Sequence, residues 1–400
     1  DWTKITKISN MFRGTAITAV PSGMETADLS NATDISCAFN YCGQLETADL
    51  SGWKISNKAT SIYAMFHMCQ KLKSAKIGNI MKSHITNISQ MFINDYLLET
   101  VDITGCDTSN VTTAESLFSG CKLLREVKGI DELNLTKCTN VSAMFAQCSP
   151  MTEFNVDKWH LDSVTNCSNM FTNCSKVTSL DFSSYNFNKS TPINFVNMCH
   201  GMSSLITIKL PSYLKGSSFN QMFYNCTSLV DLSGVTFDCT TYTPKGSQGT
   251  GGMSQMFNGC TALTKIGRLI NRGSLRAIFS ACHKLASIEE IVWANNISWY
   301  DNYVIFQGIN GSTELSVKFS IADGAYGPGY FVGASTNNSL NKPNFTRESA
   351  VSLLNSLGTF DGPTNSIGSS GHPLTFRSSV RAKLTSADIA IATAKGWTVA

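Results

Sequence analysis

The chain has 400 residues, of which 42% are hydrophobic and only 15% are charged, and its formal net charge at pH 7 is +3. The charged fraction lies well below the usual quarter of a globular protein, and lysine and arginine do not cluster. Both observations argue against nucleic acid or an anionic membrane as the main partner. No apolar run is long enough to span a bilayer. Because the chain begins at Asp1 and not at methionine, we expect a processed form from which any signal peptide has been removed.

A motif of Met-Phe, two residues and Cys, followed two residues later by an aliphatic residue, recurs along most of the chain. A fixed period is the signature of a solenoid, in which stacked repeats bury one shared core. The period of mostly 26 or 27 residues also falls in the range of leucine-rich repeats, about 20–29 residues. The phenylalanine slot is occupied, in order, by Phe12, Phe39, Phe66, Phe92, Phe118, Phe145, Phe171, Cys199, Phe223, Phe257, Phe279 and Phe306.

Each repeat continues, after its Cys slot, with a short alternation of aliphatic and polar residues, as in LETADL (45–50) and LITIKL (205–210). This alternation predicts a strand with one buried face, which must pair in parallel with the strands of neighbouring repeats. The returning segment places its Met and Phe slots at helical spacing and predicts a short helix or a 3₁₀ turn. We therefore expect a leucine-rich-repeat-like α/β solenoid, a right-handed superhelix with one short parallel strand per repeat.

The fourteen cysteines could indicate a disulfide framework. Most of them, however, recur at one slot of the repeat, which predicts small, buried, reduced side chains. Parallel stacking would also aim neighbouring Cβ atoms the same way, whereas a disulfide needs them turned toward each other. No Cys/His spacing suits zinc, so no metal is expected. The cysteines of this slot are Cys42, Cys69, Cys121, Cys148, Cys174, Cys226, Cys260 and Cys282.

The outward strand residues of successive repeats carry charges whose sign changes at nearly every step. Neighbours in a parallel sheet stand about 4.8 Å apart, which predicts an ion pair between consecutive charges. A row whose charges satisfy one another is a poor site for a charged or sugar ligand. The row runs through Asp49, Lys76, Asp102, Lys128, Asn155, Asp181 and Lys209.

Two groups of aromatic residues are candidates for an exposed binding surface. Trp53, Trp159, Tyr185 and Tyr213 stand three residues after the last apolar residue of their strands, a shared slot that favours a core corner over an exposed stacking surface. The segment IVWANNISWYDNY is less regular and contains the best candidates for an exposed binding patch. The alternative for this segment is packing beneath a degenerate repeat. Its aromatic residues are Trp293, Trp299, Tyr300 and Tyr303.

The repeat pattern predicts a solenoid over residues 1–316, with an insertion at 237–253 and an irregular last coil or linker at 317–340. The insertion has few apolar residues and is expected to be a solvated loop, with a binding loop as the alternative. Residues 341–400 predict a small α/β capping module that covers the open end of the solenoid. In it, Thr346 and Thr385 suit the N-caps of two helices, and Thr385 and Asp388 suit a capping box.

The segments NVSAMFAQCSPM and NCSNMFTNCSKVTSLDFSSYNF resemble the BspA-like branch of leucine-rich repeats found in bacterial surface proteins. The resemblance covers roughly residues 5–310 and implies export, a place at the cell surface and adhesion, without naming a ligand. The ending LTSADIAIATAKGWTVA also resembles the tail of surface proteins of gut Bacteroidetes and of some phage or mobile-element proteins.

No nucleophile elbow, phosphate loop or paired-carboxylate motif is present in the sequence. We therefore expect no enzyme, no cofactor and no catalytic or metal-binding residues. The expected function is a non-enzymatic, secreted or cell-surface binding protein of a bacterium whose partner is a host protein or a glycan, with the signal or anchor segment outside this chain. The alternative is a structural or receptor-binding component of a phage or secreted assembly.

Overall fold

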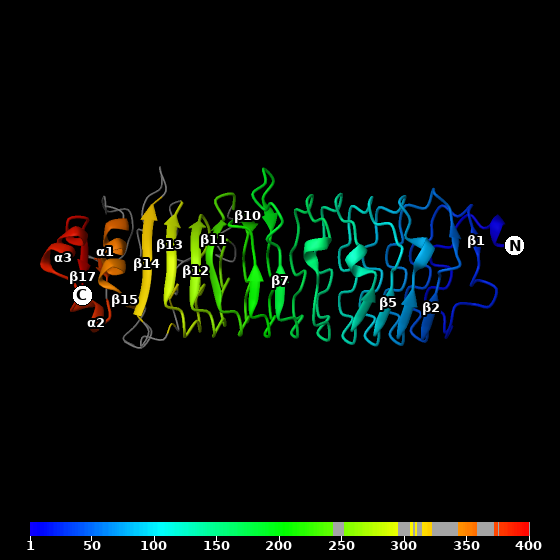
Figure 1. Ribbon diagram of the computed structural model, residues 1–400, viewed down its shortest axis with the longest axis horizontal. Helices are drawn as coiled ribbons and strands as arrows, with labels where there is room; N and C mark the ends of the chain where they lie inside the picture. The colour runs from blue at the N-terminus through cyan, green and yellow to red at the C-terminus, as the bar shows by residue number, and fades with distance from the viewer. Residues whose placement is uncertain are drawn as a thin grey trace. The chain divides into compact units, whose positions relative to one another are not determined.

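The computed structural model describes residues 1–242, 252–294, 305–306, 309, 314–321, 343–357, 372–374 and 376–399. It divides into two compact units. Unit 1 comprises Asp1–Asn186 and Asn197–Leu205, and unit 2 comprises Phe187–Val196 and Ile206–Ala400. Within each unit, successive turns of the chain, which we call rungs, stack with their strands in parallel (Figure 1). The predicted parallel solenoid is therefore confirmed.

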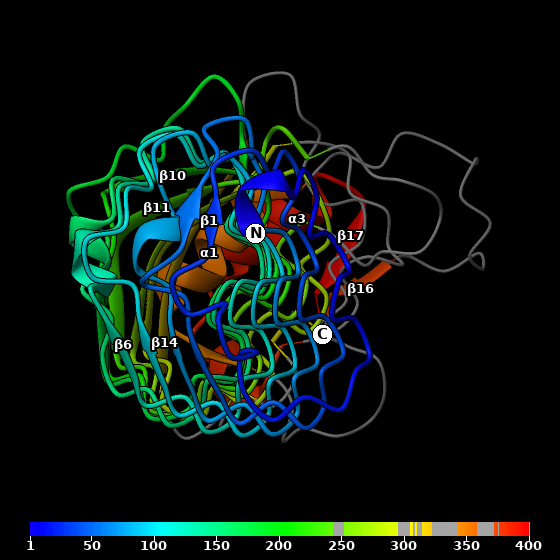
Figure 2. The same ribbon diagram turned by 90° about the vertical axis from the view of Figure 1, so that its right-hand side faces the viewer.

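Unit 1 contains little regular structure besides short strands and 3₁₀ turns. Its main sheet has the order β2-β4-β5-β6, and β1 pairs with β3. In Figure 2 the rungs of this unit, in blue and cyan, lie one behind the other. The elements are η1 (Trp2–Lys4), β1 (Asp28–Leu29), β2 (Thr47–Asp49), β3 (Lys54–Ile55), β4 (Ser74–Lys76), η2 (Gly78–Ile80), β5 (Thr100–Asp102), β6 (Glu126–Lys128), η3 (Ile130–Glu132), η4 (Val156–Lys158) and β7 (Ser179–Asp181).

Unit 2 has longer strands and the only α-helices among the described residues. Its parallel sheet has the order β15-β14-β13-β12-β11-β10-β8, and β16 pairs with β17. The elements are β8 (Ile193–Asn194), β9 (Thr207–Lys209), β10 (Tyr213–Ser218), β11 (Asp231–Asp238), β12 (Lys265–Asn271), β13 (Ser287–Trp293), β14 (Glu314–Ile321), β15 (Asn344–Phe345), α1 (Arg347–Ser356), β16 (His372–Leu374), α2 (Ser378–Arg381), α3 (Ser386–Thr393) and β17 (Trp397–Val399).

The Met-Phe segments are isolated turns, so neither the short helix nor the 3₁₀ turn predicted there is present. In the rung of Phe145, the residues before Met144 and before Cys148 have positive φ angles, 52° at Ala143 and 66° at Gln147. Left-handed residues cannot continue a right-handed helix. They turn the Phe145 N–H toward the next rung, where it donates to the carbonyl oxygen of Met170 at 3.0 Å. Hydrogen bonding between rungs has therefore replaced helical hydrogen bonding in this segment.

Two stacked columns of side chains form the core of unit 1. The Phe66 ring lies between those of Phe39 and Phe92, with ring centroids 5.4 Å apart on both sides and interplanar angles of 3° and 8°. The cysteines of the repeated slot form the second column. The same slot continues in unit 2, and each of its cysteines is fully buried. All fourteen cysteines are free. The predicted column of buried, reduced thiols is confirmed.

The capping part of unit 2 satisfies strand edges with helix side chains. Helix α1, drawn in orange beside β14 in Figure 1, places Ser349 and Ser352 against that strand. Their hydroxyl oxygens accept hydrogen bonds from the backbone N–H groups of Val317 (2.8 Å) and Phe319 (2.9 Å). The predicted N-cap of α1 at Thr346 is confirmed, and so is the capping box that begins α3. Unpaired donors of β14 are thereby removed from solvent.

The ends of the expected insertion at 237–253 belong to the core. Phe237 is buried at the end of β11, with its ring centroid 5.7 Å from that of Phe219, and Cys239 and Met253 are fully buried as well. The expectation of a solvated loop overlooked these apolar residues at its two ends. Residues 243–251 lie outside the described part of the chain.

The predicted core corner is confirmed for Trp53, Trp159 and Tyr185, whose side chains are all buried. It is wrong for Tyr213, which lies in β10 and is only half-buried. The hydroxyl of Tyr213 donates to the carboxylate of Asp238 on β11. Partial burial and this hydrogen bond raise the pKa of Tyr213 to about 12. Tyr213 is therefore a strand residue that is hydrogen-bonded to the next strand, and it does not pack in the core corner.

Candidate binding surface

The outward face of β2, β4, β5 and β6 forms a regular array of polar side chains. The strands pair so that Asp49, Lys76, Asp102 and Lys128 stand opposite one another, which confirms the predicted register of this charged row. A second row on the same face carries a hydroxyl or carboxylate from each strand, through Thr47, Ser74, Thr100 and Glu126.

The predicted ion pairs are wrong for the four residues Asp49, Lys76, Asp102 and Lys128. Neither Lys76 nor Lys128 has a carboxylate oxygen within 4.0 Å among the residues that the structure describes. The carboxylates turn back to their own chain instead: Asp49 Oδ1 accepts from the Ser51 N–H at 2.9 Å and from the Ser51 hydroxyl at 2.6 Å. Asp102 Oδ1 accepts from the backbone N–H of Thr104 at 2.9 Å. These hydrogen bonds close a local turn at the strand end, an arrangement typical of aspartate.

The same local bonds keep the two carboxylates ionised. Partial burial opposes ionisation of Asp49, but hydrogen bonds from Ser51 outweigh it and the pKa of Asp49 lies below its ordinary value. Hydrogen bonds from Thr104 lower the pKa of Asp102. The row therefore presents fixed negative charges beside two lysines without an ion-pair partner in the described chain, so it remains available to a polar ligand.

A shallow hollow of about 250 Å³ lies on this face. It is lined by all residues of β2, β4 and β5 together with Lys128 of β6. The hollow thus combines backbone, hydroxyl, carboxylate and ammonium groups, which suits a polar extended ligand and offers no arrangement of nucleophile and base.

Sequence reasoning missed a second charged row beside the first. Lys73 and Glu46, each just before the strand of its rung, form an ion pair at 2.9 Å. The signal was present in the sequence, because Glu46, Lys73, Glu99 and Arg125 alternate in sign in the same position of successive repeats. Both members of the pair are about half exposed, so its contribution to stability is a few tenths of a kcal/mol.

Two tyrosines of unit 1, the exposed Tyr41 and the half-buried Tyr96, were also missed. Tyr41 is 47% exposed; the guanidinium carbon of Arg13 lies 5.7 Å from its ring centroid, and the His67 ring lies 5.3 Å away. Lys122 Nζ lies 5.0 Å from the ring centroid of Tyr96. Both tyrosines occupy slots that hold small or polar residues in most repeats, and this departure could have identified them. Aromatic–cation groups of this kind are typical of binding surfaces.

The aromatic residues predicted to form a binding patch cannot be placed together in this way. The backbone of Trp293 ends β13. Trp299, Tyr300 and Tyr303 lie outside the described residues. These four residues stay a prediction.

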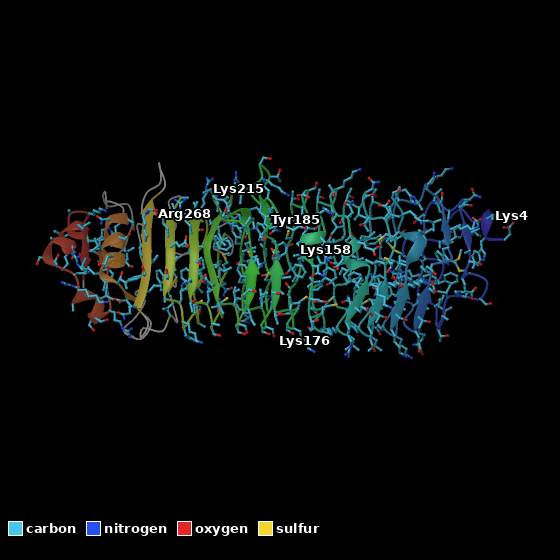
Figure 3. All side chains as sticks on the ribbon, in the orientation of Figure 1. Lys4, Lys158, Lys176, Tyr185, Lys215 and Arg268 are labelled. Carbon is cyan, nitrogen blue, oxygen red and sulfur yellow. The ribbon has the colours of Figure 1, made fainter. Side chains whose placement is uncertain are left out.

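An ion network does cross the sheet of unit 2, on residues other than those predicted. Glu290 on β13 accepts from Arg268 Nε on β12 at 2.6 Å and from Lys318 Nζ on β14 at 2.8 Å. Ser320 on β14 also donates to Glu290 at 2.8 Å. Figure 3 labels Arg268 of this network and Lys158, the cation of an ion pair with Asp131 in unit 1. One carboxylate therefore joins three strands.

Glu290→Gln is expected to destabilise unit 2 by about 1–3 kcal/mol at pH 7, because bonds to a charged acceptor are lost. Burial of Glu290 opposes ionisation, but the bonds from Lys318, Ser320 and Arg268 prevail and its pKa is lowered. A lowered native pKa stabilises the fold above the unfolded pKa of about 4.3, and this contribution disappears as pH falls through the native value. Urea unfolding should thus show a larger loss of stability at pH 7 than at pH 3.

The control for this prediction is Glu348→Gln, which removes an exposed carboxylate from the first turn of α1. It should cost only a few tenths of a kcal/mol to 1 kcal/mol. An equal loss for Glu290→Gln at both pH values would show that the charge of Glu290 contributes nothing to stability.

Neither a metal-ion site nor a membrane-spanning helix is found among the described residues. The described residues contain no group of three or more His, Cys, Asp or Glu side chains that could hold a metal ion. No helix in the described parts of the chain is long and apolar enough to cross a membrane.

Comparison with known proteins reveals similar solved structures of low sequence identity. A leucine-rich repeat protein from Bacteroides ovatus is 17% identical, with a TM-score of 0.36 and coverage of 79% of this chain and 86% of that chain. An internalin from Listeria monocytogenes is 13% identical, with a TM-score of 0.25 and coverage of 72% and 78%. A leucine-rich repeat protein from Leptospira interrogans is 12% identical, with a TM-score of 0.24 and coverage of 77% and 78%.

No curated protein matches the sequence. One family model matches it twice, at residues 1–97 and 86–208. The two matches overlap and together run through residues 1–208, which is more than half of the 400 residues. The chain therefore belongs to the family described as "Mycoplasma protein of unknown function, DUF285".

Proposed function

We propose that this chain is a non-enzymatic binding protein that acts in adhesion at a bacterial cell surface or after secretion. The observation that carries the proposal is the outward face of β2, β4, β5 and β6, where polar side chains stand in register around a hollow. Solenoids commonly bind partners on extended surfaces of this kind, because each rung adds one row of side chains to the array.

Three features support an extracellular setting. The charged fraction is low, and serine, threonine and asparagine take the place of charged residues. The repeat resembles that of BspA-like bacterial surface proteins. The thiols are buried in the core, so an oxidising environment would meet few accessible cysteines.

The partner that we propose is a protein segment or a glycan. Hydroxyl groups along one row of the hollow and alternating charges along the other suit a polar chain lying across several rungs. The pairs Arg13–Tyr41, with an exposed tyrosine, and Lys122–Tyr96, with a half-buried one, add aromatic surface in the same unit. Trp293, Trp299, Tyr300 and Tyr303 remain a second candidate location.

The test is binding to arrays of glycans and host surface proteins, followed by charge reversal. The double variant Lys76→Glu and Lys128→Glu is expected to weaken binding of an array ligand at least tenfold, because both exposed ammonium groups of the row are inverted. Its melting temperature should change by only a few degrees, since exposed charges contribute little to stability.

A matched control reverses two exposed lysines outside the sheet, Lys7→Glu and Lys58→Glu, and should bind normally. If the strand variant binds as tightly as the unchanged chain, the strand face is not the site. Loss of binding on alanine substitution of Trp299, Tyr300 and Tyr303 would then place the site in that segment. If nothing on either array binds the unchanged chain, the adhesive function is rejected.

A further inference from the structure

One rung of unit 1 breaks the cysteine column. Asp95 stands three residues after Phe92, at the slot that holds Cys69 after Phe66 and Cys121 after Phe118. Its side chain is fully buried, like the thiols on either side. A carboxyl group therefore occupies a position that the repeat otherwise gives to a small, weakly polar side chain.

The slot has a defined hydrogen-bonding role. Each thiol donates to the carbonyl oxygen of the phenylalanine one rung back: Cys69 Sγ to Phe39 O at 3.1 Å, and Cys121 Sγ to Phe92 O at 3.0 Å. The same bond recurs at Cys148, Cys174, Cys260 and Cys282. The column is thus a series of donors, and the corresponding acceptor for Asp95 is the carbonyl oxygen of Phe66.

An ionised Asp95 could not fill this role. Its Oδ1 accepts a hydrogen bond from the backbone N–H of Cys69 at 2.7 Å. Its Oδ2 is buried and has no hydrogen-bond partner among the described residues. The titratable groups that face it are the thiols of Cys69 and Cys121 on the adjacent rungs, and neither supplies positive charge. A carboxylate has no proton to donate, whereas a carboxylic acid has one.

We propose that Asp95 is a neutral carboxylic acid in the folded chain, that its Oδ2–H donates to the Phe66 carbonyl oxygen, and that its ionisation is coupled to opening of this rung. The rung would then be a pH-sensitive element in the middle of unit 1. Strand β5 follows Asp95 in the same rung and lines the hollow, so acid conditions would favour the assembled strand face. Only this last step rests on the proposed binding function.

The direction of the pH effect follows from the burial of the group. Burial raises the pKa of Asp95 well above its ordinary value, although the Cys69 N–H bond acts against it. A raised native pKa means that the folded chain holds a proton that the unfolded chain releases above a pKa of about 3.9. The stabilisation by Asp95 is therefore complete below about pH 4 and declines as pH rises toward the native pKa.

The test is Asp95→Asn, which keeps the shape and the acceptor for Cys69 and supplies an N–H donor to Phe66 without a charge. We expect the variant to melt several degrees higher than the unchanged chain at pH 8, and at the same temperature at pH 4. The opening equilibrium of the Cys69 amide, measured by hydrogen exchange, should rise up to tenfold per pH unit above pH 4 in the unchanged chain. It should not rise in the variant.

Two further measurements keep the proposal open to refutation. Asp95→Cys restores the column and should behave like Asp95→Asn, so it serves if the asparagine variant fails to fold. Asp107→Asn removes an exposed carboxylate of the same rung and should not raise the melting temperature at pH 8. The proposal is overturned if the carboxyl carbon of Asp95 titrates near pH 4 by NMR, or if both Asp95 variants share the pH dependence of the unchanged chain. None of these measurements needs a ligand, so their failure would leave the binding proposal standing.

Discussion

Phe66→Ala is expected to lower the free energy of unfolding of unit 1 by about 3–5 kcal/mol, as for other large-to-small substitutions of buried aromatic residues. The Phe66 ring is fully buried between two parallel rings, so alanine would leave a cavity and remove both stacking contacts. Its backbone N–H donates to Met91 O at 2.9 Å and would hold the turn in place, which prevents the rung from collapsing into the cavity.

The measurement is denaturant unfolding monitored by circular dichroism, with Leu97→Ala as the control. Leu97 is an apolar residue of the next rung that is 40% exposed, so its truncation should cost less than about 1 kcal/mol. Comparable losses for the two variants would indicate that the phenylalanine column does not dominate the core.

The core of this fold was predictable because each buried slot recurs with the period of the rungs. A phenylalanine or cysteine that appears once per repeat has the same neighbours above and below it, so a single interpretation applies to every copy. In the one repeat that departs from the pattern, Cys199 stands in the phenylalanine slot and Met202 in the cysteine slot, and both are fully buried. The start of α3 was predictable from local chemistry, since Thr385 and Asp388 bond each other's backbone within one helix turn.

The turns were not predictable from apolar spacing. Met, Phe and Cys at helical intervals also fit a chain that alternates between left-handed and right-handed residues, and periodicity cannot separate the two. The signal was in some of the intervening residues: Asn and Gly, which tolerate positive φ, stand before the Met or Cys slot at Asn94, Gly120 and Asn169, for example.

The candidate binding surface was predicted in position but not in chemistry. Strand register follows from the repeat, so the order of Asp49, Lys76, Asp102 and Lys128 was correct. The partners of the carboxylates depend on residues two positions further along, Ser51 and Thr104, whose local hydrogen bonds prevailed over the lysines of the next rung. Asp95 was missed because a search for repeated slots gives little weight to the residue that departs from one.

Asparagine on one rung lies over glycine on the next at three places, and these contacts require a residue without Cβ. Gly259 has a φ of 81°, and a Cβ there would lie 2.1 Å from Asn225 Oδ1. The other two pairs are Asn94 with Gly120 and Asn173 with Gly201. The close approach of successive rungs at these three places is thus encoded by an asparagine in one repeat and a glycine in the next.

Gly259→Ala is expected to destabilise unit 2 by about 1–3 kcal/mol, of which a left-handed alanine costs about 1–2 kcal/mol and displacement of the exposed Asn225 amide the remainder. Gly234→Ala is the matched control, because Gly234 has a φ of 74° in the same unit and an added Cβ would meet nothing within 4 Å. Gly234→Ala should lose only the free energy that a left-handed alanine costs, about 1–2 kcal/mol. The double variant Asn225→Gly and Gly259→Ala should recover most of the stability lost to the clash. Glycine is tolerated at position 225 because Asn225 has a φ of 58°, which glycine adopts freely. Equal losses for Gly259→Ala and Gly234→Ala in urea unfolding, with no recovery in the double variant, would show that the Asn–Gly contact does not limit the approach of the rungs.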